Sequence, residues 1–470
     1  DGVFSALIPG QAQDIITPFR VKAEDSHANP EVTWFPAEDI LKNALVRFGE
    51  PTLSGVLGTY IIWMSGANVA DLNGRDRAGR QHSDITFVVE NYRAIYNAGL
   101  RLRSGGYACT IPDSDRFLGN NDVKIDSTPP ETRLEEYHAN WVAKEGGMAG
   151  SNHRFILARM NGPDTFRQQN QTASRDFCKS WYGDDDPVVY KDMTYDPFGR
   201  YVRSDGSRAK AKCRFSARRK KTTLPSDNFD AIYDVSDASR LNAEFVVARM
   251  KALIDPYGFG AYFGVNMMTG GGDYYLHPHG HNMYFYSSTT RRTWLHLHDA
   301  DAAYGTGYDG TGTDLKRING VWGPLYNRPL FSRAYWRFLK NLADGPLTTQ
   351  ASAPELLGWY DVLKAYGFEL GHPQNMIDAN ANRRSTILNQ LPVTSFSISQ
   401  QNFSTSNNIV TLSGNAPIEV ASFRINGRNL RVTYPEETDW RTSIGLTDGP
   451  NAFVVEGLDR EGRIVSNDTV

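Results

Sequence analysis

The residues with the clearest chemical potential gather in one segment, residues 273–301, which reads DYYLHPHGHNMYFYSSTTRRTWLHLHDAD. Five of the ten histidines of the chain lie in it. His277, His279 and His281 are two residues apart, and side chains at that spacing share one face of a strand. Such imidazoles can converge on a metal ion such as zinc, as they do in metal-dependent hydrolases. The alternative is that they are ordinary loop and hairpin histidines held by hydrogen bonds.

The same segment also carries oxygen ligands. A hairpin with Asn282 at the start of one strand and Asp299 and Asp301 after the other would bring these three side chains together. Ligation by oxygen alone suits a hard cation such as Mg²⁺, which leaves room for the phosphate oxygens of a substrate. Asp273, further upstream, could then position or deprotonate an acceptor hydroxyl. Equally, Asp299 and Asp301 could simply end a strand.

Two further motifs are better explained by structure than by binding. GTGYDG (305–310) matches G-x-G-x-x-G, but a dinucleotide fingerprint needs a strand before it and a helix after it. Turn-like residues follow instead, so we predict a loop, and no glycine-rich phosphate loop is evident elsewhere. The block RAKAKCRFSARRKK (208–221) is strongly basic. It is typical of a solvated edge strand, and binding of an anion or an acidic peptide is the alternative.

The hydrophobic pattern predicts the elements that must position these residues. A hairpin is predicted over 282–298, with the polar turn SSTTRR at its tip. Apolar spacings of three and four residues predict helices, over 131–144, 242–255, 330–344, 354–366 and 373–390. Apolar runs predict strands over 59–64, 85–89, 100–103 and 155–160. The central region is therefore expected to be mixed, with a helical C-terminal half.

Both ends of the chain have the pattern of β-modules. Residues 393–470 alternate apolar and polar positions over short runs, which predicts a small sandwich of immunoglobulin-like size. Strand-like runs near the N-terminus, at 17–24 and 31–36, resemble the tail of another β-module. We therefore predict an N-terminal β segment that is a partial immunoglobulin-like module, a central domain and a C-terminal sandwich, over residues 1–72, 73–391 and 392–470.

Composition excludes several classes of protein. Fifty basic and fifty-three acidic residues leave a net charge of −3, so no overall basic field indicates a nucleic acid or an anionic membrane. No apolar run is long enough to span a bilayer. The cysteines Cys109, Cys178 and Cys213 match no C-x-x-C metal or redox spacing, and they allow at most one disulfide.

Several short motifs follow one another between residues 85 and 391. They are GLRLRSGG (99–106), DRFLG (115–119), the helix at 131–145, RFILARMNG (154–162), VVYKD (188–192), HNMYFY (281–286), LHLHDADAAYG (295–305), NRPLFSRAYWRFL (327–339) and a closing helix with Arg383 and Arg384. In this order they resemble the CotH kinase family, named after a bacterial spore-coat protein. The N-terminal strands (5–28) resemble immunoglobulin-like modules of large secreted bacterial proteins.

The resemblance implies an α+β protein with a divergent protein-kinase-like central domain, flanked by immunoglobulin-like modules. The implied activity is that of a secreted or cell-surface bacterial protein kinase that uses ATP and Mg²⁺ or Mn²⁺, with Ca²⁺ as a further choice. A protein substrate and cell-surface or extracellular-matrix partners are expected. Two alternatives stay open, a non-catalytic surface or adhesion protein (a pseudokinase) and a metal-dependent hydrolase that uses the histidines at 277–281.

The resemblance also implies roles in metal binding and catalysis. Asp273 would be the catalytic base, and Asn282 would be a metal ligand. Asp299, with Asp301, would take the metal-binding role of the kinase D-F-G aspartate. The Asn282 amide and the Asp299 carboxylate are then expected to face one cleft, with Asp273 at its mouth.

For the nucleotide, the resemblance implies a lysine and an acidic partner. Lys191 is the first choice for a contact to the nucleotide phosphates, with Lys124 as the second. Glu135 or Glu136, on the helix predicted at 131–144, would orient that lysine. Lys191 is expected to approach the cleft from the wall opposite the hairpin.

Overall fold

The structure is a computed structural model of mixed α/β architecture. It describes residues 5–470 with gaps at 37–42, 54, 77–78, 80, 91, 104, 128–133, 193–197, 199–201, 209–214, 218–228, 271–281, 291, 305–313, 319 and 401. The chain divides into two compact units. Unit 1 comprises Asp1–Arg133, Ser151–Ser180 and Val362–Leu370, and unit 2 comprises Leu134–Gly150, Trp181–Asp361 and Gly371–Val470.

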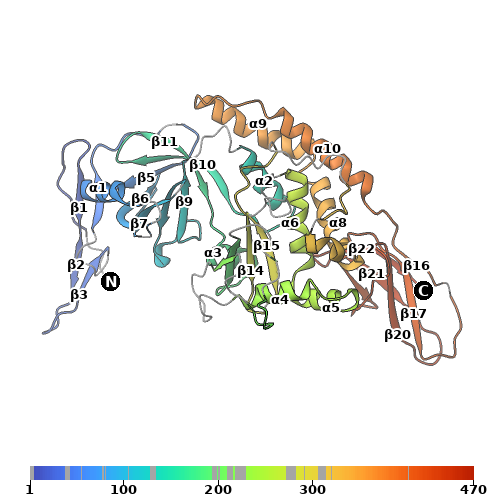
Figure 1. Cartoon of the computed structure of the whole chain (residues 1–470). Coiled ribbons are helices and arrows are strands. Elements are labelled where there is room, and N and C mark those ends of the chain that lie inside the picture. The colour runs from blue at the N-terminus through green and yellow to red at the C-terminus, as the bar shows by residue number, and fades with distance from the viewer. Residues whose placement is uncertain are drawn as a thin grey trace. The chain divides into compact units, whose positions relative to one another are not determined.

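Unit 1 is built around a closed barrel, whose strand order among the described residues is β10-β11-β9-β8-β7-β6-β5 (Figure 1). Neighbours are antiparallel except β10 and β5, whose parallel pairing closes the barrel. Alternate residues such as Ile85, Phe87 and Val89 face the apolar interior. The strands are β5 (Thr59–Trp63), β6 (Ser83–Val89), β7 (Arg93–Arg103), β8 (Gly106–Thr110), β9 (Asp122–Asp126), β10 (His153–Met160) and β11 (Asp164–Asn170). All four strands predicted in this region are confirmed, whereas their closure into a barrel was not predicted.

The N-terminal segment packs on the outside of this barrel. Leu45 lies in an apolar cluster with Ile61, Trp63 and Val88 of the barrel's outer face. The elements of this segment are β1 (Ile16–Phe19), which pairs with β4 (Ala44–Arg47), β2 (Val21–Glu24), which pairs with β3 (Val32–Phe35), and α1 (Gly66–Gly74). The predicted division at residues 72 and 73 falls inside α1, and the three-domain division of the chain stays a prediction.

Unit 2 contains a four-stranded antiparallel sheet in the order β13-β12-β14-β15. The hairpin predicted over 282–298 is confirmed as its last two strands. One face of the hairpin, with Met283, Phe285, Leu295 and Leu297, belongs to the main apolar core. The edge strand β13 falls within the basic block, as predicted. The strands are β12 (Val188–Asp192), β13 (Phe215–Ala217), β14 (Met283–Ser287) and β15 (Thr293–Leu297).

The core of unit 2 is centred on α6 (Pro256–Thr269), a helix that the sequence pattern did not predict. It is apolar on every side, so it has no amphipathic stripe to detect. Both ends of α6 carry the usual helix-capping residues. The Asp255 side chain, at the N-cap, accepts a 2.7 Å hydrogen bond from an N–H of the first turn. Gly270, at the C-cap, adopts a left-handed conformation (φ 61°). A Cβ at Gly264 would lie 2.7 Å from the Phe338 ring, so glycine permits close packing there.

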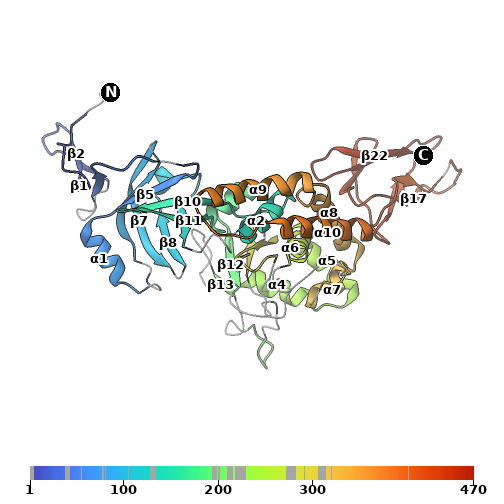
Figure 2. The same cartoon turned by 90° about the horizontal axis from the view of Figure 1, so that it is seen from above.

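The helices predicted from periodicity are all present. They are α2 (Leu134–Glu145), α5 (Ala243–Leu253), α8 (Pro329–Asp344), α9 (Thr349–Ala365) and α10 (Gln374–Gln390). Within unit 2, α8 packs against both α6 and α10 (Figure 2). Shorter helices that were not predicted are α3 (Arg175–Tyr182), α4 (Asp230–Ala238) and α7 (Gly323–Tyr326). None of the helices in the described part of the chain has the length and apolarity needed to cross a bilayer.

The C-terminal part of unit 2 consists of two antiparallel sheets around a common core that includes Leu412, Phe423, Trp440 and Val455. The sheets are β16-β17-β20 and β19-β18-β21-β22. Their strands are β16 (Ser397–Ile398), β17 (Ile409–Asn415), β18 (Ser422–Ile425), β19 (Arg428–Leu430), β20 (Asp439–Gly445), β21 (Val454–Leu458) and β22 (Ile464–Thr469). The immunoglobulin-like character of this part stays a prediction.

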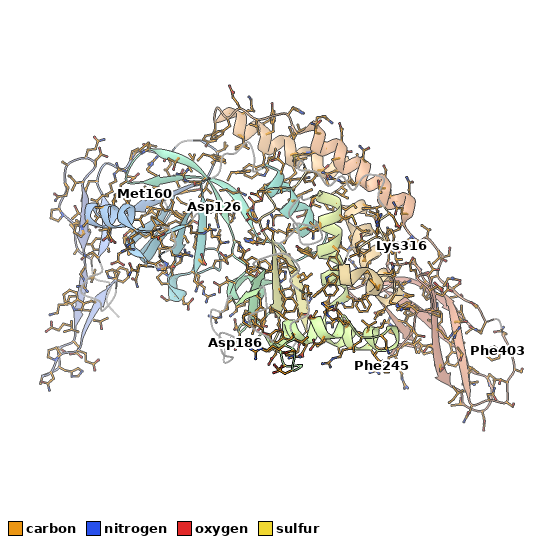
Figure 3. All side chains as sticks on the ribbon, viewed as in Figure 1. Asp126, Met160, Asp186, Phe245, Lys316 and Phe403 are labelled. Atoms are coloured by element: carbon orange, nitrogen blue, oxygen red, sulfur yellow. The ribbon has the colours of Figure 1, made fainter. Side chains whose placement is uncertain are left out.

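Helix α8 holds this C-terminal part through a buried arginine. Arg333 is 1% exposed, and its guanidinium donates hydrogen bonds to four backbone carbonyls of the C-terminal part. The acceptors and distances are Ala416 (2.9 Å), Glu437 (2.5 Å), Pro417 (2.7 Å) and Val420 (3.0 Å). Lys316, labelled in Figure 3, also forms an ion pair with Glu437, and the two charged groups are 3.0 Å apart.

Candidate functional site

The open end of the β14–β15 hairpin brings two of the predicted metal ligands together. Because Met283 pairs with Leu297, the residues just outside the strands lie side by side. The Asn282 side-chain amide donates a 3.2 Å hydrogen bond to the backbone carbonyl of Asp299. Asn282 is 2% exposed, whereas Asp299 is exposed. The sequence-based expectation that these two residues meet therefore agrees with the backbone register, while their roles as metal ligands stay a prediction.

Both residues have an unusual backbone conformation. Asn282 has a φ of 34° and Asp299 a φ of 57°, which lie in the left-handed region that L-residues rarely occupy. Asparagine and aspartate tolerate this region better than other non-glycine residues, but it still carries a conformational cost. Such conformations gather at binding sites and active sites, because a required side-chain placement can outweigh the local strain. The pair is thus marked as a candidate site by backbone geometry as well as by chemistry.

The turn after Asp299 presents its carboxylates outward. Asp299 and Asp301 are exposed, whereas Ala300 and Ala303 are buried and fix the turn to the core. The Ala303 N–H donates to the Ala300 carbonyl at 3.1 Å, which closes the turn. Carboxylate and amide oxygens, which Asp299, Asp301 and Asn282 carry at this end of the hairpin, are the ligand type that a hard cation such as Mg²⁺, Mn²⁺ or Ca²⁺ prefers. Asp273, the proposed base, lies outside the described residues.

The histidines proposed as zinc ligands, His277, His279 and His281, lie outside the described residues. The motif GTGYDG at 305–310 also lies outside them. His296 is 1% exposed on β15, and burial lowers its pKa to about 3, so it is a neutral histidine of the interior. Within the described part of the chain, no three histidine, cysteine, aspartate or glutamate side chains are grouped so that they could hold a metal ion. The zinc site stays a prediction.

Lys191 lies on the same sheet as the hairpin, which corrects the expectation that it comes from an opposite wall. It is on β12, next to β14, and pairs with Tyr284. Its sequence neighbour Tyr190 belongs to the apolar core, so Lys191 points to the other face of the sheet. The reason for the difference is topological: VVYKD (188–192) joins the hairpin as a third strand instead of forming a separate wall.

Lys124, the second choice, lies on the barrel of unit 1 beside a glycine turn. It is on β9 and pairs with Ala108 of β8, and β8 follows β7 through a tight turn at Gly105 and Gly106. Gly106 has a φ of 146°, and a Cβ there would lie 2.3 Å from the Ile125 carbonyl oxygen, so only glycine fits.

The two glycines of this turn end the motif GLRLRSGG (99–106). The turn packs on the end of β9, where the Ser127 N–H donates to the Gly105 carbonyl at 2.7 Å. Asp126, labelled in Figure 3, forms an ion pair with Arg103 and accepts a 2.8 Å hydrogen bond from the Asn170 amide. Lys124 and the turn thus lie in the same part of the barrel wall, on β9 and at the start of β8.

The two candidate acidic partners begin α2. Glu136 is 2% exposed, and Glu135 is partly buried with an Oε2 atom that has no hydrogen-bond partner in the described chain. Burial raises the pKa of the Glu135 carboxyl. A buried carboxylate oxygen without a partner is costly, and a cationic side chain would relieve that cost. This observation fits the proposed role of orienting a lysine.

Comparisons with known proteins add little to this geometry. The sequence matches no family model, and no curated protein matches it. One solved structure that aligns with the chain is the Helicobacter pylori proinflammatory kinase CtkA. The alignment covers 62% of this chain and 92% of the CtkA chain, at 9% identity and a TM-score of 0.27. A likeness at that TM-score does not establish a shared fold, so the interpretation of the site depends on the residues of this chain.

Proposed function

We propose that this protein is a metal-dependent phosphotransferase that moves phosphate from ATP to a protein substrate. The observation that carries the proposal is the meeting of Asn282 and Asp299 at the open end of the hairpin, both with left-handed backbone. An amide and exposed carboxylates on a turn fixed by buried alanines are suited to a hard cation. In phosphoryl transfer such a cation bridges phosphate oxygens and offsets the charge that develops on them.

In this proposal the other residues take the roles that the resemblance to the CotH kinase family implies. Asp273 accepts the proton of the attacking hydroxyl. Lys191, with Lys124 as the second candidate, contacts a phosphate oxygen, and Glu135 or Glu136 orients the lysine. The proposal includes a secreted or cell-surface setting, with ATP and Mg²⁺ or Mn²⁺ as cofactors.

The first experiment is a phosphorylation assay with labelled ATP and Mg²⁺ or Mn²⁺, with the protein itself and a generic acidic protein as acceptors. Asp299→Asn is the sharpest variant, because asparagine tolerates the left-handed backbone of this position while the carboxylate charge is lost. We expect metal affinity and label transfer to fall by at least the roughly 10–100-fold that loss of an outer-shell partner causes in metal sites.

A matched control is Asp14→Asn. Asp14 is an exposed aspartate with a similar backbone conformation (φ 66°), and it lies outside the candidate site. It should leave both metal binding and label transfer unchanged, and His279→Ala should retain most of the label transfer.

Two outcomes would overturn the proposal. Loss of activity in His279→Ala but not in Asp299→Asn, together with bound zinc, would favour the hydrolase. Absence of both nucleotide and metal binding in the wild type would favour a non-catalytic surface protein.

A further inference from the structure

Tyr304 connects the end of the Asp299–Asp301 turn to the core of unit 2. It follows Asp301 by three residues and has a left-handed backbone (φ 59°). Its backbone N–H donates a 2.8 Å hydrogen bond to the carbonyl of Thr269, the last residue of α6. Its hydroxyl donates a 2.9 Å hydrogen bond to the Oδ1 of Asn380 on α10. Both ends of this residue are thus fixed to helices of unit 2.

Asn380 is the centre of a buried polar bridge. It is 0% exposed, and while its Oδ1 accepts from Tyr304, its Nδ2 donates to the Nε2 of His138 at 2.8 Å. His138, on α2, is also 0% exposed and stacks on Trp141 with 5.1 Å between the ring centroids. A buried amide is stable only where its polar atoms have partners. The bridge therefore fixes Tyr304 relative to α10 and to α2, the helix that begins with Glu135 and Glu136.

Arg383 completes the arrangement from the next turn of α10. Its Cζ lies 4.9 Å from the centroid of the Tyr304 ring, a cation–π distance. The side chain is 4% exposed, and its Nε and Nη1 have no hydrogen-bond partner in the described chain. A buried cation with two unpaired nitrogens has its desolvation poorly compensated, so it contributes little to stability. Its contact with the Tyr304 ring is an interaction that its position does provide.

We infer that Tyr304, Asn380 and Arg383 are positioning residues that hold the Asp299–Asp301 turn in the conformation that a cation requires. The inference depends on the proposed function for its metal, but the immobilised turn is a property of the protein without metal. The left-handed residues at both ends of the turn, Asp299 and Tyr304, make it prone to relax when an anchor is removed. Loss of the Tyr304 hydroxyl should then change the backbone conformation at Asp299, although the hydroxyl bonds to Asn380 and not to Asp299.

The variant that tests this inference is Tyr304→Phe, which deletes one hydroxyl and keeps the ring under Arg383. Its matched control is Tyr326→Phe, because the Tyr326 side chain also lies in unit 2 and its hydroxyl donates a 2.8 Å hydrogen bond to the Pro256 carbonyl. Both variants lose one partly buried hydrogen bond, so a general loss of stability affects them alike. Arg383→Met is a second test variant, which removes the cation from the Tyr304 ring.

Two measurements separate the inference from the proposed function. The first is hydrogen–deuterium exchange of the peptide spanning 299–304 without metal, which should speed up about tenfold in Tyr304→Phe and Arg383→Met but not in Tyr326→Phe. The second is Mn²⁺ affinity, which should fall about tenfold in the same two variants, as expected for outer-shell partners. Exchange that matches the wild type in both would overturn the inference. A wild type that binds no Mn²⁺ would overturn the proposed function, while the exchange data would still decide whether these residues immobilise the turn.

Discussion

Replacement of Arg333 by alanine should loosen the attachment of the C-terminal sheets to α8. The guanidinium is buried at the junction and satisfies four backbone carbonyls, and its Cζ lies 4.5 Å from the centroid of the Tyr434 ring. Arg337, one turn later on α8, adds hydrogen bonds to the carbonyls of Ile418 and Val420, both 2.9 Å long.

The magnitude follows from two opposing effects. Hydrogen bonds from a charged donor contribute about 1.5–3 kcal/mol each, so four of them set an upper limit of roughly 6–12 kcal/mol. Burial of the guanidinium opposes this, and the same burial lowers the pKa of Arg333 and brings that of Arg337 to about 10. Removal of one partner from a buried charged contact typically costs about 3–5 kcal/mol. We therefore expect Arg333→Ala to destabilise unit 2 by about 4 kcal/mol.

Thermal unfolding is a direct assay, since about 4 kcal/mol corresponds to a fall in Tm of roughly 8–16 °C for a unit of a few hundred residues. Arg333→Met should lose most of the same stability, because it refills the volume but removes the guanidinium donor. The Val420 carbonyl keeps its hydrogen bond from Arg337, and the Pro417 carbonyl keeps that from the Val420 N–H, so the loss falls mainly on Ala416 and Glu437. Arg424→Ala is the control, because Arg424 forms a partly exposed ion pair with Glu456 that lies within the C-terminal sheets and not at the junction with α8. A Tm of Arg333→Ala that equals that of the control would refute the reasoning.

Limited proteolysis tests the same contact in a different way. We expect cleavage at residues 391–395, where the predicted central and C-terminal domains meet, and Val393 in this stretch is 82% exposed. After cleavage there, the C-terminal fragment should stay bound to the rest of the wild-type protein and separate from it in Arg333→Ala. Separation of the wild-type fragments under native conditions would contradict the structural role of Arg333.

Two further predictions concern buried titratable groups. Burial lowers the pKa of His138 from 6.5 to about 3. As the pH falls below 6.5, this histidine therefore binds a proton in the unfolded chain but not in the folded chain. The free energy of unfolding should then decrease by about 1.4 kcal/mol per pH unit because of this residue. Urea unfolding between pH 7 and 4.5 measures this effect. The free energy of unfolding should fall less steeply with decreasing pH in His138→Gln than in the wild type, whereas His372→Gln, at an exposed position, should behave like the wild type. An equal pH dependence in all three proteins would exclude the effect. Cys109 is 0% exposed, and burial raises the pKa of its thiol. Iodoacetamide should therefore leave Cys109 unmodified in native buffer and modify it in denaturant. Rapid modification in native buffer would show that the barrel opens.

How much the sequence predicts depends on whether a signal is local. The helices of unit 2 with apolar residues at intervals of three and four, and the hairpin at 282–298, were predictable because side-chain periodicity reports directly on secondary structure. α6 was not, because a helix buried on all sides has no polar face, and its three- to four-residue pattern disappears. Its cap residues, Asp255 and Gly270, were the remaining local signal.

The candidate site divides in the same way. That Asn282 and Asp299 lie close together followed from the sequence, because a hairpin brings residues just outside its paired strands together whatever surrounds it. The location of Lys191 did not follow, because pairing of β12 with β14 joins segments almost a hundred residues apart, and strand order is set by which faces can be buried together.

The sequence by itself determined the amphipathic helices, the hairpin and the residue types at the open end of the hairpin, since these depend on residues close in the chain. Only the tertiary structure decided that the barrel closes through β5 and β10, that Asn380 and Arg383 reach Tyr304, and that Arg333 holds the C-terminal sheets. Each of these contacts joins groups far apart in sequence. Its free energy depends on burial and on exact partners, and neither is defined until the whole chain has packed.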